Sequence, residues 1–183
     1  MGFVLFGVVM NEGTALMIID AQVHMFAPPN PVYQAEELLE RLKKLLSLAR
    51  ASGTQVIFVQ NNGSVGESDE PRTRGWLIHP ELEVVMGDMV LQKAEGSAYA
   101  GNDLEKRLKQ IGIKKLIIAG LQSEYCILTN CEKSIDAGFE VILVSDAHST
   151  YDSGTQKASE IIAAINARLR NKVEMWRVDD VAI

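Results

Sequence analysis

The chain has 183 residues, of which 47% are hydrophobic and 23% charged, and its formal net charge is −6. This length and composition indicate one soluble globular domain with a core of its own, and the absence of any basic run argues against nucleic acid or an anionic membrane as a partner. The two cysteines, Cys126 and Cys131, are too few for a disulfide framework, so a cytoplasmic location is expected.

The N-terminal residues 1–10 (MGFVLFGVVM) are almost wholly apolar. They are too few to span a bilayer, and they lack the basic region and the cleavage site of a signal peptide. We interpret them as an appended segment that packs on the domain or on a neighbouring subunit. An extra edge strand and a leader from an upstream start are the alternatives. The predicted organisation is an apolar extension over residues 1–13 and a single domain over residues 14–183.

The first predicted element of the domain is a strand at residues 15–19 (ALMII), which is followed by Asp20. Continuous apolarity is typical of a strand buried on both faces, as in parallel sheets. Apolar residues at helical spacing then predict a helix over residues 32–50, which Gly53 ends because glycine tolerates the left-handed conformation. A second buried strand is predicted at residues 56–59.

The longest irregular stretch covers residues 61–80 and is rich in Gly, Ser, Asp and Pro. A loop of this length in a compact domain is usually functional or mobile. Residues 88–92 then predict a third strand, with Lys93 at its carboxyl end. The remaining predicted elements are a helix at 103–111, a strand at 115–119, a helix at 127–137, a strand at 141–144, a helix at 158–169 and a strand at 173–176.

The order of these elements indicates the fold class. Three times a helix ends at a glycine and a short link leads into a buried strand, at Gly53, Gly112 and Gly138. This alternation is typical of βαβ units. We therefore predict an α/β fold of three layers, αβα, around a six-stranded and mostly parallel sheet. Ligands of such sheets bind outside the carboxyl ends of the strands.

Asp20, Lys93 and Cys126 all lie at or just beyond such carboxyl ends. Taken singly, the aspartate could be a turn residue, the cysteine a packing residue and the lysine a solvated side chain. Their coincidence on one edge favours nucleophilic catalysis instead. Asp20 would take the thiol proton, Lys93 would keep Asp20 ionised, and backbone N–H groups at the strand-to-helix turn would stabilise an oxyanion. The helix dipole should lower the pKa of the Cys126 thiol.

Five short motifs carry a resemblance to a known family. They are ALMIIDAQ at 15–22 with Phe26, GWLIHPEL at 75–82, VLQK at 90–93 followed by Ser97, IAGLQSEYC at 118–126, and VSDA at 144–147. In these the chain resembles the isochorismatase-like cysteine hydrolases over residues 14–178. The resemblance implies their Rossmann-like fold and an Asp20–Lys93–Cys126 catalytic triad. It also implies a non-proline cis peptide near Leu121-Gln122, which turns the Gln122 N–H toward the oxyanion beside that of Cys126.

The chain departs from this pattern in one region. Nicotinamidases of the family carry an Asp-x-His and a further histidine as metal ligands after the second strand, whereas residues 59–64 here are VQNNGS. No catalytic metal is therefore expected, and nicotinamide is not the expected substrate. His24, His79 and His148 have no metal-ligand spacing; His79 is expected to hold its loop and His148 to line the sheet edge. Nucleotide-binding glycine motifs are also absent, so no cofactor is expected.

The predicted function is a cysteine-dependent hydrolase that cleaves an amide, carbamoyl or ureido C–N bond of a small molecule through a thioester. Isochorismatases proper cleave a vinyl ether and lack the nucleophilic cysteine, so Cys126 favours C–N hydrolysis. A same-fold hydrolase of esters or vinyl ethers and a catalytically idle binding or assembly protein are the alternatives. Family members assemble, so a homo-oligomer, dimer or tetramer, is expected by analogy. The predicted substrate-pocket residues are Gln22, Phe26, Trp76, Tyr99 and Tyr125.

Overall fold

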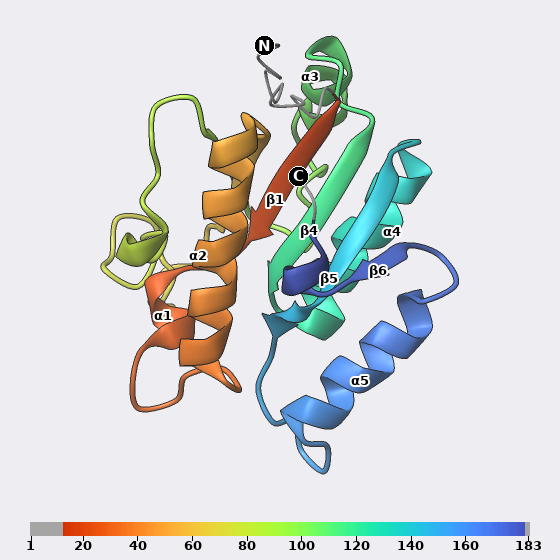
Figure 1. Cartoon of the computed structure of the whole chain (residues 1–183). Helices are drawn as coiled ribbons and strands as arrows, with labels where there is room; N and C mark the ends of the chain where they lie inside the picture. The colour runs from red at the N-terminus through yellow and green to blue at the C-terminus, as the bar shows by residue number, and fades with distance from the viewer. Residues whose placement is uncertain (1–12, 182–183) are drawn as a thin grey trace, which may run out of the picture.

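Six parallel strands form the central sheet of the computed structural model, which describes residues 13–181 (Figure 1). Their order across the sheet is β3-β2-β1-β4-β5-β6, and every neighbouring pair is parallel. Parallel neighbours need crossover connections, which the helices supply. The strands are β1 (Thr14–Ile19), β2 (Gln55–Asn61), β3 (Met89–Lys93), β4 (Lys115–Leu121), β5 (Glu140–Ser149) and β6 (Glu174–Trp176).

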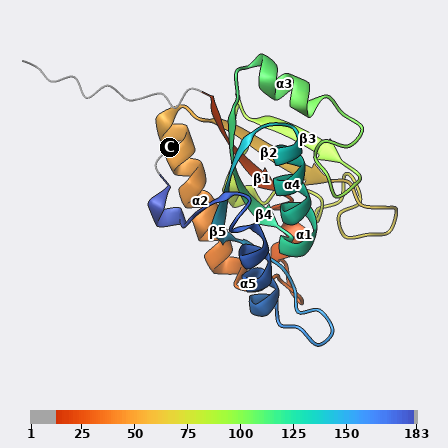
Figure 2. The ribbon, with the colours of Figure 1, turned by 90° about the vertical axis from the view of Figure 1, so that its right-hand side faces the viewer.

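Helices cover both faces of this sheet. On one face lies α2 (Ala35–Ser52), and on the other lie α3 (Leu104–Gln110), α4 (Leu128–Asp136) and α5 (Ala158–Leu169). Figure 2 shows α2 and α4 on opposite sides of the strands. The arrangement confirms the predicted αβα fold with its six-stranded parallel sheet. The short helical segments are α1 (Val23–Phe26), η1 (Pro80–Leu82), the π-helical turn η2 (Ser123–Ile127) and η3 (Val178–Asp180).

The central strand β1 is buried along its whole length. Leu16 and Ile18 belong to the hydrophobic cluster under α2, whereas Met17 and Ile19 belong to the cluster on the opposite face. Side chains alternate between the two faces of a strand, so a strand covered on both sides must be apolar at every position. This is the physical reason for the unbroken apolar run in the sequence.

Some element boundaries differ from the predicted ones. The helix α5 occupies the predicted residues, and Gly53 ends α2 in the left-handed conformation, as expected. The start of α2 is later than predicted because Gln34 has a positive φ, which an α-helix excludes. Strand β5 continues past its predicted end because its pairing with β4 resumes after a register shift and carries His148 beside Gly120.

The predicted apolar extension is almost wholly outside the described residues, since only Gly13 of it is described. Its packing therefore stays a prediction. Between residues 13 and 181, no helix is both long enough and apolar enough to cross a membrane.

Candidate active site

The carboxyl edge of the sheet brings the three predicted catalytic side chains together. Asp20 directly follows β1, Lys93 is the last residue of β3, and Cys126 lies in η2, which follows β4. Strand β2 separates β1 from β3 in the sheet, so the long Lys93 side chain is needed to reach Asp20. Asp20 itself has a positive φ of 50°, a conformation that aspartate tolerates better than most residues. Its N–H still donates to the carbonyl of Val59 on β2 at 2.8 Å.

The ammonium group of Lys93 is the centre of this arrangement. Its Nζ lies 2.8 Å from Asp20 Oδ2, 3.0 Å from Asn61 Oδ1 and 3.4 Å from Cys126 Sγ. An ammonium has three N–H donors, and each of them has one acceptor here. The side chains of Lys93 and Asp20 are only 1% and 3% exposed, so their ion pair is shielded from water. The three contacts therefore fix the position of the Lys93 ammonium.

The second carboxylate oxygen of Asp20 has no other hydrogen-bond partner among the described residues and can accept the thiol proton. This oxygen, Oδ1, is buried. Burial raises the pKa of the Asp20 carboxyl, and the adjacent Lys93 charge opposes this rise. The result is a carboxylate that is more basic than an exposed aspartate but is still favoured in its ionised form by Lys93.

The thiol of Cys126 is protonated at rest. Burial, together with the negative charge of Asp20, raises its pKa to about 12. The expectation that the helix dipole lowers this pKa is therefore wrong in direction. The physical reason is that the sulfur is largely enclosed beside a carboxylate, and both conditions disfavour a thiolate. The thiol consequently needs a base to become a nucleophile.

The turn that carries Cys126 begins at a cis peptide bond between Leu121 and Gln122. Beyond it, the Gln122 carbonyl accepts hydrogen bonds from the N–H groups of Tyr125 and Ile127, at 3.2 and 3.0 Å. These bonds close the wide π-helical turn η2, where the sequence predicts only the approach to a helix beginning at residue 127. Gln122 and Cys126, the two residues predicted to supply oxyanion-hole N–H groups, thus belong to one tightly bonded turn.

Asn61 is a site residue that the sequence analysis did not single out. It accepts a hydrogen bond from Lys93, and its Nδ2 donates to Asp69 Oδ2 at 2.7 Å. Asp69 lies in the long loop and is itself buried. The signal was present in the sequence, since Asn61 follows the second predicted strand and so belongs to the same carboxyl edge as Asp20 and Lys93.

Of the predicted pocket residues, Gln22 and Tyr99 have their polar atoms bonded to other parts of the protein. Gln22 is fully buried. Its Nε2 donates to the carbonyls of Asn61 and Trp76, at 3.0 and 2.9 Å, and its Oε1 accepts from the Asn61 N–H. The Tyr99 hydroxyl lies 2.8 Å from Ser134 Oγ on α4. Both side chains therefore stabilise the segments around the site through hydrogen bonds.

The other predicted pocket residues are partly or largely exposed. Phe26 on α1 meets the His79 ring edge to face, with 5.1 Å between the centroids, and the indole N–H of Trp76 donates to Asn62 Oδ1 at 2.8 Å. Tyr125, next to the cysteine, is 61% exposed. Their accessible surfaces stay candidates for substrate contacts.

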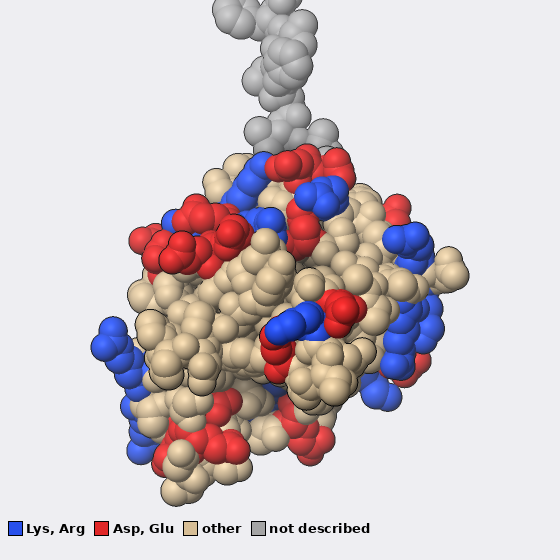
Figure 3. Space-filling model, turned by 90° about the horizontal axis from the view of Figure 1, so that it is seen from below, with Lys and Arg blue, Asp and Glu red and all other residues tan. Residues whose placement is uncertain are grey.

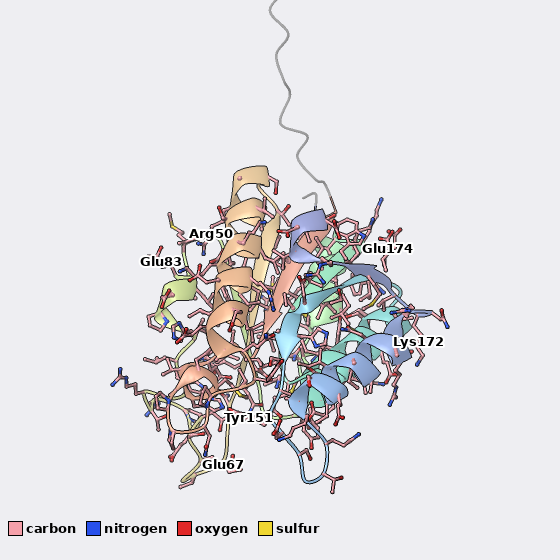
Figure 4. The ribbon with its side chains drawn as sticks, turned by 60° about the horizontal axis from the view of Figure 1, so that its bottom comes forward. Arg50, Glu67, Glu83, Tyr151, Lys172 and Glu174 are labelled. Carbon is pink, nitrogen blue, oxygen red and sulfur yellow. The ribbon has the colours of Figure 1, made fainter. Side chains whose placement is uncertain are left out.

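A cavity of about 700 Å³ lies beside α1 and is lined in part by Val23, Arg74 and Tyr151. The Tyr151 hydroxyl donates to Met25 Sδ at 3.6 Å, and the Gln122 amide donates to the same sulfur at 3.8 Å. Met25 therefore contacts both Tyr151, which lines the cavity, and Gln122, which begins the catalytic turn. Figure 4 labels Tyr151 in the lower half of its view. Figure 3, the view from below, shows residues other than Lys, Arg, Asp and Glu over much of its middle, around a small central group of basic and acidic residues.

Within the described residues, no three His, Cys, Asp or Glu side chains converge in a way that could hold a metal ion. Asn61, at the end of β2, is bonded to Lys93 and to Asp69. His148 is buried and is bonded to Ser123 and Asn166.

Comparisons with known proteins identify the family and agree with the fold. Residues 14–169 match the isochorismatase domain. The chain is 31% identical over 166 residues to a streptothricin hydrolase of Streptomyces noursei, a match that covers 91% of this chain and 59% of that protein. It is 30% identical over 142 residues to the uncharacterized isochorismatase family protein YddQ of Bacillus subtilis, covering 75% of this chain and 78% of that protein.

A solved structure of similar fold is that of an isochorismatase from Pseudomonas putida, with a TM-score of 0.88 and 26% sequence identity. The likeness covers 93% of this chain and 90% of that one. The chain thus spans nearly the whole of this structure, but less than two thirds of the length of the streptothricin hydrolase.

Proposed function

This chain belongs to the isochorismatase family of hydrolases, and we propose that within it the protein is a cysteine hydrolase of C–N bonds in small amides, carbamoyl compounds or ureides. The observation that carries the proposal is the pair of contacts of the buried Lys93 ammonium, with Asp20 and with Cys126 Sγ. An ion pair with Asp20 alone would not require the Lys93 ammonium to lie 3.4 Å from a thiol sulfur.

In the first half of the reaction, Asp20 takes the proton of the Cys126 thiol, and the sulfur forms a bond to the substrate carbonyl carbon. The carbonyl oxygen becomes an oxyanion, which the N–H groups of Gln122 and Cys126 stabilise. The C–N bond then breaks, and the leaving nitrogen takes the proton from Asp20 as it departs. A thioester remains on Cys126.

In the second half, Asp20 accepts a proton from a water molecule whose oxygen attacks the thioester carbonyl. The C–S bond breaks, the acid is released, and the proton returns to the sulfur. Lys93 stays positively charged throughout, so it stabilises both the ionised Asp20 and the transient thiolate. The raised pKa of the Asp20 carboxyl supports its role as a base, because basicity near the working pH favours proton transfer.

The reaction is tested by measuring ammonia or amine release from a panel of small carboxamides and ureides. Streptothricin is included because one relative is a streptothricin hydrolase. We expect turnover by the wild type and none by Cys126→Ala. Cys131→Ala is the matched control, since Cys131 is the other cysteine and is buried in the core. Full turnover by Cys126→Ser would favour a same-fold hydrolase that does not use a thiol nucleophile.

We also propose that the protein is a cytoplasmic homo-oligomer, a dimer or a tetramer. An open sheet edge supports this, because β3 is an edge strand with Val90 42% exposed, and the segment before it leaves Met86 fully exposed. Light scattering coupled to size-exclusion chromatography would give the mass of a dimer or tetramer. The mass of one chain would contradict the proposal.

A further inference from the structure

A chain of hydrogen-bonded polar side chains, two of them buried, runs behind the turn that carries Cys126. Ser123 in η2 is fully buried, and its Oγ lies 2.8 Å from Nδ1 of His148, which is 3% exposed. The other ring nitrogen, Nε2, lies 2.9 Å from Asn166 Oδ1 on α5. Asn166 Nδ2 in turn donates to the Ser145 carbonyl at 3.0 Å. The chain therefore links η2, β5 and α5, and the reaction described above does not use it.

The hydrogen bonds fix the direction of every link. A backbone carbonyl can only accept, so the group that Asn166 presents to Ser145 must be its NH₂, and its Oδ1 must face His148. Nε2 of His148 must then carry a hydrogen. Burial lowers the pKa of the ring, so the ring is neutral and its Nδ1 is an acceptor. It follows that the Ser123 hydroxyl donates to His148 and has one fixed orientation.

A second set of contacts joins the end of β5 and Thr150, which follows it, to the same turn and to the end of β4. The Thr150 hydroxyl donates to Glu124 Oε1 at 2.9 Å, and Leu121 pairs with Ser149 in the sheet. Residues 148–150, which follow the register shift, thus contact Ser123, Leu121 and Glu124, respectively. The turn is therefore shaped by β5 from outside as well as by its own backbone bonds.

We propose that His148, as the neutral tautomer with hydrogen on Nε2, is a positioning residue. By orienting the Ser123 hydroxyl it holds the turn in which the N–H groups of Gln122 and Cys126 meet the oxyanion. His148 touches neither substrate nor sulfur. Its removal should impair steps that pass through an oxyanion and spare those that do not. The inference rests on the proposed acyl transfer to Cys126.

Two reagents separate these kinds of step at the same sulfur. With p-nitrophenyl acetate, the sulfur forms a bond to the acetyl carbon, p-nitrophenolate leaves, and the thiol proton goes to Asp20; the path includes an oxyanion. With iodoacetamide, the sulfur displaces iodide from a saturated carbon, the thiol proton again goes to Asp20, and no oxyanion forms. The ratio of the acylation rate to the alkylation rate at Cys126 therefore measures how well the turn stabilises an oxyanion.

The variants are Ser123→Ala, His148→Gln and His148→Asn. The shorter Asn side chain places an acceptor near the position of Nδ1, so it preserves the bond to Ser123, whereas Gln reaches toward Asn166 and loses that bond. We expect acylation to fall about tenfold or more in Ser123→Ala and His148→Gln, which is less than the 100-fold or greater loss on deleting an oxyanion-hole donor. Alkylation should be unchanged in both, and His148→Asn should keep most of the acylation rate.

Equal losses of acylation and alkylation, or no loss of either, would overturn the role of His148. Acylation that persists in Cys126→Ala would instead contradict the proposed function, so the two failures are distinguishable. Nitrogen-15 NMR of the histidine rings in the wild-type protein provides a reading that does not depend on activity. A signal for Nε2–H in His148 agrees with the proposal, and a hydrogen on Nδ1 overturns it.

Discussion

Cys126 is the residue on which the proposed chemistry depends, and its surroundings keep it unreactive until a base acts. The thiol has a pKa raised to about 12 by burial and by the neighbouring Asp20 charge. The carboxylate that opposes ionisation is also the base that we propose takes the thiol proton. Proton transfer from Cys126 to Asp20 removes both obstacles together, because it neutralises the carboxylate as it creates the thiolate beside Lys93.

The pH dependence of catalysis should report the ionisation of Asp20. Only the ionised carboxylate can accept the thiol proton, so kcat/KM should fall as the pH drops through the Asp20 pKa. That pKa lies above the ordinary value of 3.8 because burial raises it, so the acidic limb should appear above pH 3.8 in a profile of kcat/KM.

Two substitutions check the assignment of this limb. Asp69 also raises the pKa of Asp20 through its negative charge, so Asp69→Asn should move the limb to lower pH. Asp20→Asn should lower the rate about 100-fold or more and abolish the limb, because the base is lost. A limb that stays in place in Asp20→Asn would assign it to another group.

The ion pair of Lys93 and Asp20 should be important for stability as well as catalysis. Lys93→Met leaves a carboxylate buried without its partner, so the free energy of unfolding at neutral pH should fall by about 3–5 kcal/mol. The double variant with Asp20→Asn should recover part of this loss, because no charge is then buried. Urea denaturation of the single and double variants measures both values.

The control is Lys44→Met, which removes the exposed pair between Lys44 and Asp179. Exposed pairs contribute about 0–1 kcal/mol, so the two lysine variants should differ clearly. Similar small losses in both would show that the Lys93 pair is solvated and not buried.

At the scale of elements, the site depends on a close approach between two strands just before the catalytic turn. Gly120 on β4 has a φ of +119°, and an added Cβ would collide with the Ile19 carbonyl on β1. A glycine is required there because any side chain would push the strands apart. Asp20 and the turn of Cys126 follow directly on these two strands, so their separation depends on this contact.

Gly120→Ala should therefore lower the free energy of unfolding by about 2 kcal/mol or more, since it combines an unfavourable backbone conformation with a steric clash. Gly138→Ala is the matched control: Gly138 also has a positive φ, but nothing lies within 4 Å of its added Cβ. It should cost about 1–2 kcal/mol from conformation alone. Thermal unfolding of both variants gives the comparison, and equal losses would exclude the close approach as the cause.

Elements with strong periodicity were predictable from the sequence, and elements shaped by tertiary contacts were not. The apolar stripe of α5 gave its correct bounds, because burial of one face determines where that helix lies. The polar residues after Val144 suggested that the strand ends there, yet β5 extends to Ser149. That extension exists because residues 148 and 149 pair with β4 beyond a register shift, which no local pattern encodes.

The same distinction applies to the site. Asp20, Lys93 and Cys126 were found because strand ends are visible in the sequence and share one edge of a parallel sheet. The raised pKa of Cys126 could not be predicted from the sequence, because burial and the neighbouring Asp20 charge are properties of the folded site. Likewise, the link from Ser123 through His148 to Asn166 joins three elements far apart in the sequence.

At the scale of the whole molecule, one sheet serves two hydrophobic clusters. Residues of β1 and β4 alternate between the cluster under α2 and the cluster on the opposite face. Loss of either cluster exposes the same strands to water. The described residues should therefore unfold as one cooperative unit, and a defect on the α2 face should destabilise the distant face as well.

Leu42→Ala tests this coupling, because Leu42 is fully buried under α2. The substitution should cost about 2–5 kcal/mol, and circular dichroism and tryptophan fluorescence should still give one coincident transition. Leu77→Ala is the control, since Leu77 is 49% exposed. Two separated transitions in Leu42→Ala would mean that the faces unfold independently.

The central claim is that Cys126 forms a covalent thioester with the substrate. Its most direct test is intact-mass spectrometry of the acid-quenched protein after mixing with each amide and ureide of the panel, followed by peptide mapping. A mass increase equal to the acyl fragment should appear on the peptide that contains Cys126, persist in Cys131→Ala and disappear in Cys126→Ala. Substrate turnover by Cys126→Ala at the wild-type rate, with no adduct on the wild-type protein, would contradict it.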